Sequence, residues 1–158
     1  MSDENLVENE EGGPHEGREV QFMLAGKKEV AFFCYDYPEE HFQDMRRCID
    51  DGLFETIKFG AEENFNLLAQ TPGALDWARE HLGDGPYEHL VVYVPGARDK
   101  ALRFIELQKC ASKYGYIESV EREIGNILGY SQESTDRYIK KLKQRYPNLR
   151  QFPPDSNE

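Results

Sequence analysis

The chain has few cysteines, no long apolar run and no excess of positive charge. Its 158 residues include three cysteines at wide, irregular spacing, and no Cys-x-x-Cys pair occurs. This spacing gives little support to a zinc site or a dithiol redox pair, and it favours free, mostly buried thiols in a reducing compartment. No apolar run approaches the roughly 20 residues that a membrane-spanning helix needs.

Signals for export and for catalysis are also sparse. The first residues are acidic and polar, without the basic start and apolar core of a signal peptide, so we expect a cytoplasmic protein. The four histidines form no His-x-x-x-His pair for a metal. Cys34 and His41 could be drawn as a nucleophile and its base, but we favour a buried strand cysteine beside a surface histidine. We therefore expect no enzymatic activity and no catalytic, cofactor-binding or metal-binding residues.

The net charge of −11 is unevenly distributed along the chain. Residues 1–17 contain six acids and no Lys or Arg, so the rest of the chain carries only −5. Such a body repels a phosphate backbone over most of its surface. Residues 136–150 reverse this sign, with six bases and the single acid Asp136.

Composition divides the chain into four parts. Residues 1–17 are acidic and contain Gly12-Gly13-Pro14, which predicts a disordered acidic tail. We expect an α+β domain over residues 18–112, a helical segment packed on it over 113–147, and a flexible tail over 148–158. A chain of this size can bury a sizeable core without a disulfide or metal.

The apolar patterns predict a small antiparallel or mixed sheet packed by helices. Alternation over 20–25 and an apolar run over 30–37, joined by a turn at Gly26, predict a hairpin. Residues 89–94 predict a further strand, whereas 53–59 fit a strand or a helix. The expected helices begin at Pro38 and cover 62–70, 74–82 and 98–112, and the C-terminal third is helical.

Two helices joined by a tight turn are predicted over residues 117–146. Apolar residues recur at intervals of three and four in each half, the spacing of one buried helix face. Gly129 is placed to end the first helix, and Ser131 is placed to cap the second.

The segment 121–142 resembles a helix-turn-helix motif, especially that of the LysR-type regulators. The matching residues are a small residue in the first helix, the turn, and three residues of the second helix: Gly125, Gly129, Ser131-Gln132, Arg137, Ile139 and Leu142. The resemblance implies that the second helix enters the major groove of DNA. Tyr130 and Thr135 depart from the motif, which usually has aliphatic residues there.

By this resemblance, five residues of the second helix are candidates for nucleic-acid binding. Gln132 and Arg137 would contact bases, and Lys140, Lys141 and Lys143 would contact phosphates. Glu133 and Asp136 would lie close to the DNA and add repulsion.

Leu128-Gly129-Tyr130 also resembles a helix corner of uncharacterised prokaryotic proteins that read Leu-Gly-Tyr-Pro-Glu-Cys-Cys. Here Ser131 to Ser134 replace the proline and both cysteines, so thiol chemistry is not implied. This second resemblance implies a packed corner and gives no function.

The sequence thus leaves two roles open. We expect a non-enzymatic adaptor or regulatory protein acting through protein contacts, because an aromatic-rich body with oppositely charged ends suits docking. The alternative is a helix-turn-helix transcriptional regulator that binds nucleic acid.

Overall fold

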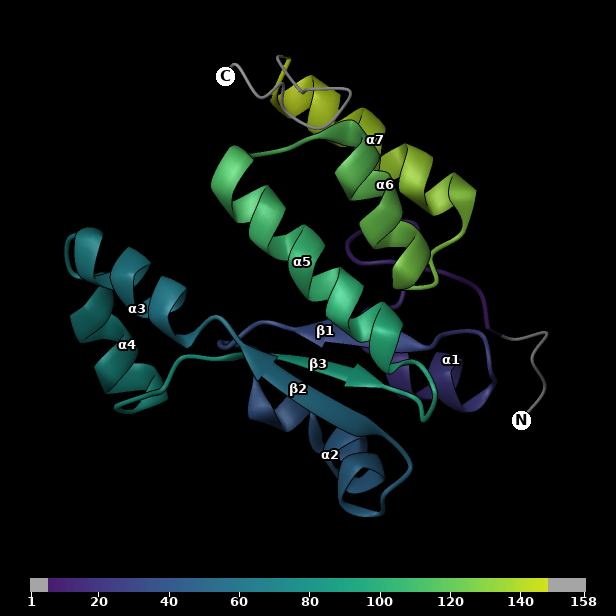
Figure 1. The fold of residues 1–158 in the computed structure, drawn as a ribbon, viewed down its shortest axis with the longest axis horizontal. Coiled ribbons are helices and arrows are strands. Elements are labelled where there is room, and N and C mark those ends of the chain that lie inside the picture. The colour runs from purple at the N-terminus through teal and green to yellow at the C-terminus, as the bar shows by residue number, and fades with distance from the viewer. Residues whose placement is uncertain (1–5, 148–158) are drawn as a thin grey trace. The chain divides into compact units, whose positions relative to one another are not determined.

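The computed structural model describes residues 6–147, which form an α+β fold of two compact units (Figure 1). Unit 1 combines residues 1–31 with 93–158, and unit 2 is the intervening segment 32–92. The two boundaries between the units fall within strands, the first in β1 (Val30–Phe33) and the second in β3 (His89–Tyr93). The division therefore differs from the predicted boundary at 112/113. Among the described residues, no helix is both long and apolar enough to cross a membrane.

The strands form an antiparallel sheet with the order β1-β3-β2. Val94 N–H donates to the Glu29 carbonyl at 3.0 Å, pairing the residue after β3 with the residue before β1. The segment 53–59, for which strand and helix were both open, contains strand β2 (Glu55–Phe59). The predicted strand at 89–94 is confirmed as β3.

Unit 2 also holds the helices predicted in the middle of the chain. These are η2 (Glu39–His41), α2 (Gln43–Asp50), α3 (Ala61–Gln70) and α4 (Ala74–Leu82). Leu68, Ala78 and Tyr87 form a buried cluster that packs α3 against α4. Cys34 is exposed, so the expectation of mostly buried thiols is wrong there.

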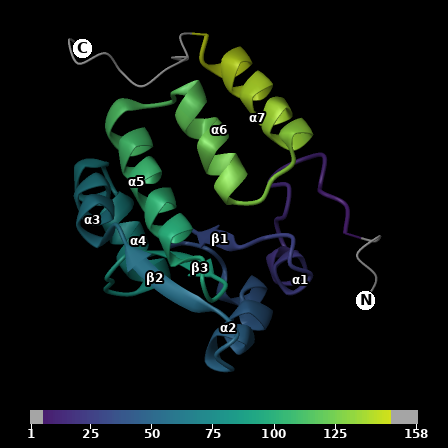
Figure 2. The ribbon, with the colours of Figure 1, turned by 45° about the vertical axis from the view of Figure 1, so that its right-hand side comes forward.

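Unit 1 contains α1 (Glu19–Leu24), α5 (Arg98–Tyr114), α6 (Glu118–Ile127) and α7 (Gln132–Arg145). Helix α6 packs against both α5 and α7, and it lies between them in Figure 2. Leu107, Ile117 and Val120 form a buried cluster between α5 and the start of α6. The two predicted C-terminal helices are thereby confirmed.

The prediction of a first hairpin strand over residues 20–25 is wrong, because Glu19–Leu24 forms the helix α1. Phe22 and Met23 are adjacent and both buried, whereas adjacent residues of a strand point to opposite faces. The sheet therefore uses β1 without a hairpin partner from residues 20–25.

The predicted disorder of residues 1–17 also differs from the structure. Residues 6–17, which we call the strap, are ordered along unit 1, and His15 within them is only 1% exposed. His15 stacks on Phe22 at 4.0 Å between ring centroids, which anchors the strap to α1. Residues 1–5 and the predicted flexible tail 148–158 lie outside the described residues.

Candidate nucleic-acid interface

A four-residue turn, 128–131, joins α6 to α7. Tyr130 N–H donates to the Gly125 carbonyl at 3.0 Å, and Gly129 N–H donates to the Asn126 carbonyl at 3.1 Å. These two bonds form a Schellman motif, which requires a left-handed residue after the last helical turn. Gly129 supplies it with a φ of +81°. The glycine predicted to end the first helix therefore does so.

Gly125 lets α6 and α7 approach each other closely. A Cβ atom at position 125 would lie 2.8 Å from Thr135 Oγ1, closer than real Cβ contacts come. Thr135 is buried, so this hydroxyl sits inside the contact between the two helices. Gly125 and Thr135 thus pack directly against each other where the two helices meet.

The first turn of α7 is capped by Ser131. Its backbone is extended, and its Oγ accepts a hydrogen bond from Ser134 N–H at 3.1 Å. A side-chain oxygen at this position satisfies one of the backbone donors that a helix start leaves unpaired. The predicted cap is confirmed.

We expect Ser131→Ala to lower the free energy of unfolding of unit 1 by about 1 kcal/mol, because the cap is lost. Urea unfolding followed through the methyl resonances of the buried Ile139 in α7 would measure this. Ser112→Ala, at an exposed position of α5, is the control and should not destabilise. Equal destabilisation by both substitutions would contradict the role of Ser131.

The predicted binding residues lie on the outer side of α7. Gln132, Lys140, Lys141 and Lys143 are exposed, and Arg137 is half-buried. The buried side of the helix is formed by other residues: Ser134, Thr135, Ile139 and Leu142. A continuous outer face of α7 therefore remains accessible within unit 1.

Ion pairs with α6 occupy part of this face. Arg122 Nη1 lies 2.6 Å from Asp136 Oδ1, and Lys143 Nζ lies 2.7 Å from Glu118 Oε1. The bonds from Lys143 and Arg122 hold the pKa of Glu118 below its ordinary value. Asp136, expected to repel DNA, thus has its charge balanced by Arg122, and Lys143 is engaged with an acid.

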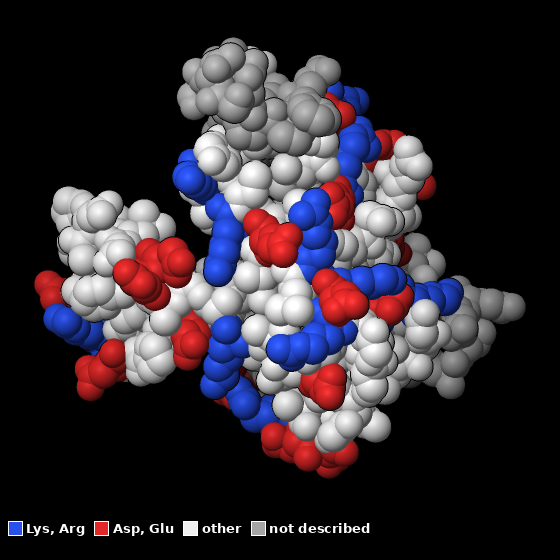
Figure 3. All heavy atoms as spheres, viewed as in Figure 1, with Lys and Arg blue, Asp and Glu red and all other residues white. Residues whose placement is uncertain are grey.

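Lys140 and Lys141 are different from Lys143. Within residues 6–147, neither makes an ion pair. Figure 3 shows Lys and Arg interspersed with Asp and Glu on the face that it draws, as expected where pairs such as Arg103–Glu123 form. Of the candidate cations Arg137, Lys140, Lys141 and Lys143, these two lysines are therefore the best placed for an external anion.

Arg137 is bound to its own helix. Its Nη2 donates to Ser134 Oγ at 3.0 Å, and its Nη1 lies 3.9 Å from Glu133 Oε1. The guanidinium is thus held beside the first turn of α7.

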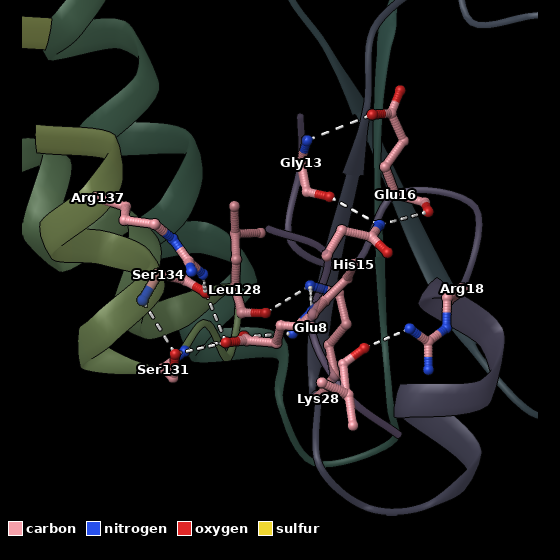
Figure 4. A network of polar contacts seen from close by, with 12 residues as sticks. Glu8, Gly13, His15, Glu16, Arg18, Lys28, Leu128, Ser131, Ser134 and Arg137 are labelled. Atoms are coloured by element: carbon pink, nitrogen blue, oxygen red, sulfur yellow. Dashed lines mark hydrogen bonds and ion pairs between the residues drawn. The ribbon is translucent and has the colours of Figure 1, made fainter. Parts of the chain in front are cut away.

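A carboxylate from the strap reaches this same turn. Glu8 Oε2 accepts from Ser131 N–H at 3.0 Å, and Glu8 Oε1 accepts from Ser134 Oγ at 2.7 Å and from Ser131 Oγ (Figure 4). Burial raises the pKa of Glu8, but these hydrogen bonds outweigh it and set the pKa at about 2. Glu8 is therefore charged at neutral pH, as favoured by the positive end of a helix.

Behind Glu8 lies a buried chain of polar groups. His15 Nε2 is 2.9 Å from Glu8 Oε2, and Lys28 Nζ is 3.0 Å from His15 Nδ1. Because an ionised carboxylate can only accept, Nε2 carries the proton and Nδ1 accepts from Lys28. Lys28 also donates to the Leu128 carbonyl at the end of α6.

Burial changes the protonation of this chain. It lowers the pKa of Lys28 to about 7, against the opposing charges of Glu19 and Glu8. It also lowers the pKa of His15 to about 4, with a further contribution from the charge of Lys28. A neutral lysine amine has two N–H groups, which matches the two acceptors present.

A second buried acid lies where α6 meets α7. Tyr138 OH donates to Glu121 Oε1 at 2.8 Å, and burial raises the pKa of Glu121. Both side chains line a groove of about 1180 Å³ together with strap residues and Tyr116. Within residues 6–147, no group of three or more His, Cys, Asp or Glu side chains is arranged so that it could hold a metal ion.

Sequence reasoning missed Glu8, His15 and Lys28. The first two were assigned to a disordered tail, and Lys28 was assigned to a hairpin turn. Their contacts span up to 126 positions of the chain, and no local pattern encodes such a contact. The only feature of the sequence that could have suggested these contacts was the opposite charge of the acidic strap and the basic segment 137–150.

Comparison of the chain with protein-family models, curated proteins and solved structures finds no match.

Proposed function

We propose that this protein is a regulator that binds duplex DNA, with α6 and α7 acting as a helix-turn-helix. The observation that carries this proposal is the four-residue glycine turn between two closely packed helices, with the second helix exposed on its outer face. In DNA-binding helix-turn-helix proteins, the second helix of such a pair lies in the major groove.

The residues of α7 have distinct roles in this proposal. Lys140 and Lys141 bind phosphates, because they are exposed and make no ion pair among the described residues. Gln132, at the exposed start of α7, reads a base edge, which its amide can do by bidentate hydrogen bonds. Arg137 joins in once it leaves Ser134, and Lys143 contributes less because Glu118 binds it.

The protein's charge sets the affinity to be expected. A net charge of −11 repels DNA over most of the surface, so attraction comes from one helix face. Free thiols agree with a cytoplasmic location, which we include in the proposal. The proposed role is binding, without a catalytic step.

Titration of a fluorescent duplex of random sequence at about 50 mM salt tests the proposal. We expect wild-type protein to bind with a dissociation constant of about 10 μM and to weaken steeply as salt is added. Lys140→Ala should lower the slope of log affinity against log salt by about 1, because one phosphate contact is lost.

Lys109→Ala is the matched control for this titration. Lys109 is an exposed lysine of α5 in the same unit, so its loss changes net charge equally without touching α7. No binding by the wild type at low salt, or equal effects of the two substitutions, would overturn the proposal.

The adaptor role is the second candidate, and exposed apolar side chains of unit 2 favour it. Phe65 and Leu67 of α3 are 45% and 64% exposed, and Trp77 of α4 is 49% exposed. Large apolar side chains at the surface are typical of protein interfaces. If Trp77→Ala abolished capture of a host protein while Lys140→Ala left it intact, contacts through unit 2 would be favoured.

A further inference from the structure

The carboxylate of Glu8 occupies the place at the start of α7 where an anion binds best. It accepts hydrogen bonds from one backbone N–H and from the hydroxyls of Ser131 and Ser134. Backbone N–H groups and hydroxyls at a helix start are the donors that proteins use for DNA phosphates. A phosphate at this position and Glu8 would therefore compete for the same donors.

Charge strengthens this competition. A cavity of about 500 Å³ beside Glu8 is lined by Arg137 and by two further acids, Glu10 and Glu133. Three carboxylates and Lys27 thus share this cavity with the guanidinium that would otherwise face the DNA. With Glu8 in place, a phosphate approaching this turn meets repulsion and finds its donors taken.

When Glu8 leaves this position, its bonds to Ser131, Ser134 and His15 break, but the rest of the strap keeps hydrogen bonds of its own. Asn9 N–H donates to the Pro14 carbonyl at 2.8 Å, and the Asn9 amide donates to the Gly13 and Glu16 carbonyls. These bonds close a loop over residues 9–16, which His15 anchors in the core. Glu8 precedes this loop, and its side chain is 17% exposed at the edge of unit 1.

We propose that Glu8 is an autoinhibitory contact, which masks the first turn of α7 and must swing away before that turn binds a DNA phosphate. This inference rests on the proposed function, because it names how the same interface is regulated. The N–H of Ser131 and the hydroxyls of Ser131 and Ser134 become available only in the released form, so Glu8 weakens the binding of every duplex.

Duplex titrations of Glu8→Gln and Glu11→Gln test this inference. Each substitution removes one negative charge from the strap, but Glu11 is exposed and lies outside the contact with α7. We expect Glu8→Gln to bind duplex about tenfold more tightly than wild type, because a phosphate contact is gained at low salt. Glu11→Gln should change the affinity less than about twofold. Equal changes in the two variants would overturn the inference.

A second test uses the wild-type protein alone, so it does not depend on whether a variant folds. Saturation with duplex should shift the side-chain carboxyl resonance of Glu8 and the amide resonance of Ser131, while the carboxyl resonance of Glu11 stays in place. A stationary Glu8 resonance in the DNA complex would overturn the inference.

Inorganic phosphate separates this inference from the proposed function. If no variant binds duplex, the proposed function fails. The inference is then decided by whether phosphate shifts the Ser131 amide in Glu8→Gln and leaves it unmoved in the wild type. The absence of a shift in Glu8→Gln would overturn the inference as well.

Discussion

Gly125→Val is expected to lower the free energy of unfolding of unit 1 by about 3 kcal/mol, because overpacking a close helix contact is costly. The first atom added would lie 2.8 Å from Thr135 Oγ1 and 3.4 Å from Thr135 Cγ2. Thr135 is buried and cannot move freely, so α6 and α7 must separate. Duplex binding should be lost at the same time, because it depends on how α7 is held.

Asn126→Val is the matched control for this prediction. Asn126 is the next residue of α6 and is exposed, so the same side chain enters the same helix without meeting α7. It should change stability by less than about 0.5 kcal/mol. Urea unfolding followed through the methyl resonances of Ile139 measures both variants, whereas the single tryptophan, Trp77, lies in unit 2. Equal stabilities would mean that α6 and α7 pack differently.

The stability of unit 1 should rise with pH between pH 7 and about 9 because of Lys28. Its pKa is about 7 in the folded protein and 10.5 in its ordinary state, so in this range the unfolded chain binds a proton that the folded chain has released. Stability increases with pH wherever the unfolded state binds more protons. We expect a gain of about 2 kcal/mol between pH 7 and pH 9.

The neighbours His15, Glu8 and Tyr130 leave this window clear. His15 and Glu8, with pKa values of about 4 and 2, titrate well below it. Burial raises the pKa of Glu19 and moves the pKa of Tyr130 to about 12. Since an unfolded tyrosine ionises near pH 10, Tyr130 opposes the trend only above the window.

Lys28→Met should abolish the slope, whereas the exposed Lys27→Met should keep it. Urea unfolding at several pH values, followed through the buried methyl groups of Ile117 and Ile139, measures the slope. The ¹³Cε resonance of Lys28 gives its pKa directly. A wild-type stability that stays constant between pH 7 and pH 9 would contradict the lowered pKa of the buried Lys28 amine.

Elements with a strong local signal could be predicted from the sequence. Gly129 and Ser131 define the turn between α6 and α7, and the apolar spacing on each side defines the buried faces. The α+β class and β3 followed from similar local patterns. Such signals depend on neighbours within a few residues, which a sequence displays directly.

The remaining features depend on contacts across the chain. The segment Glu19–Leu24 alternates like a strand, but packing of Phe22 on His15 accompanies a helix there. The strap has the composition of a disordered segment, yet one buried histidine and one capping carboxylate hold it. Ser131 and Ser134, which Glu8 contacts at the start of α7, lie more than 120 residues away in the sequence, so no local pattern indicated this contact.

Amide chemical-shift mapping with a duplex of random sequence tests most directly whether α7 is the DNA-binding helix. We predict shifts at the exposed face of α7, including Gln132, Lys140 and Lys141, and none at α3 or α4 of unit 2. Shifts confined to unit 2, or no shifts at about 50 mM salt, would contradict DNA binding by α7.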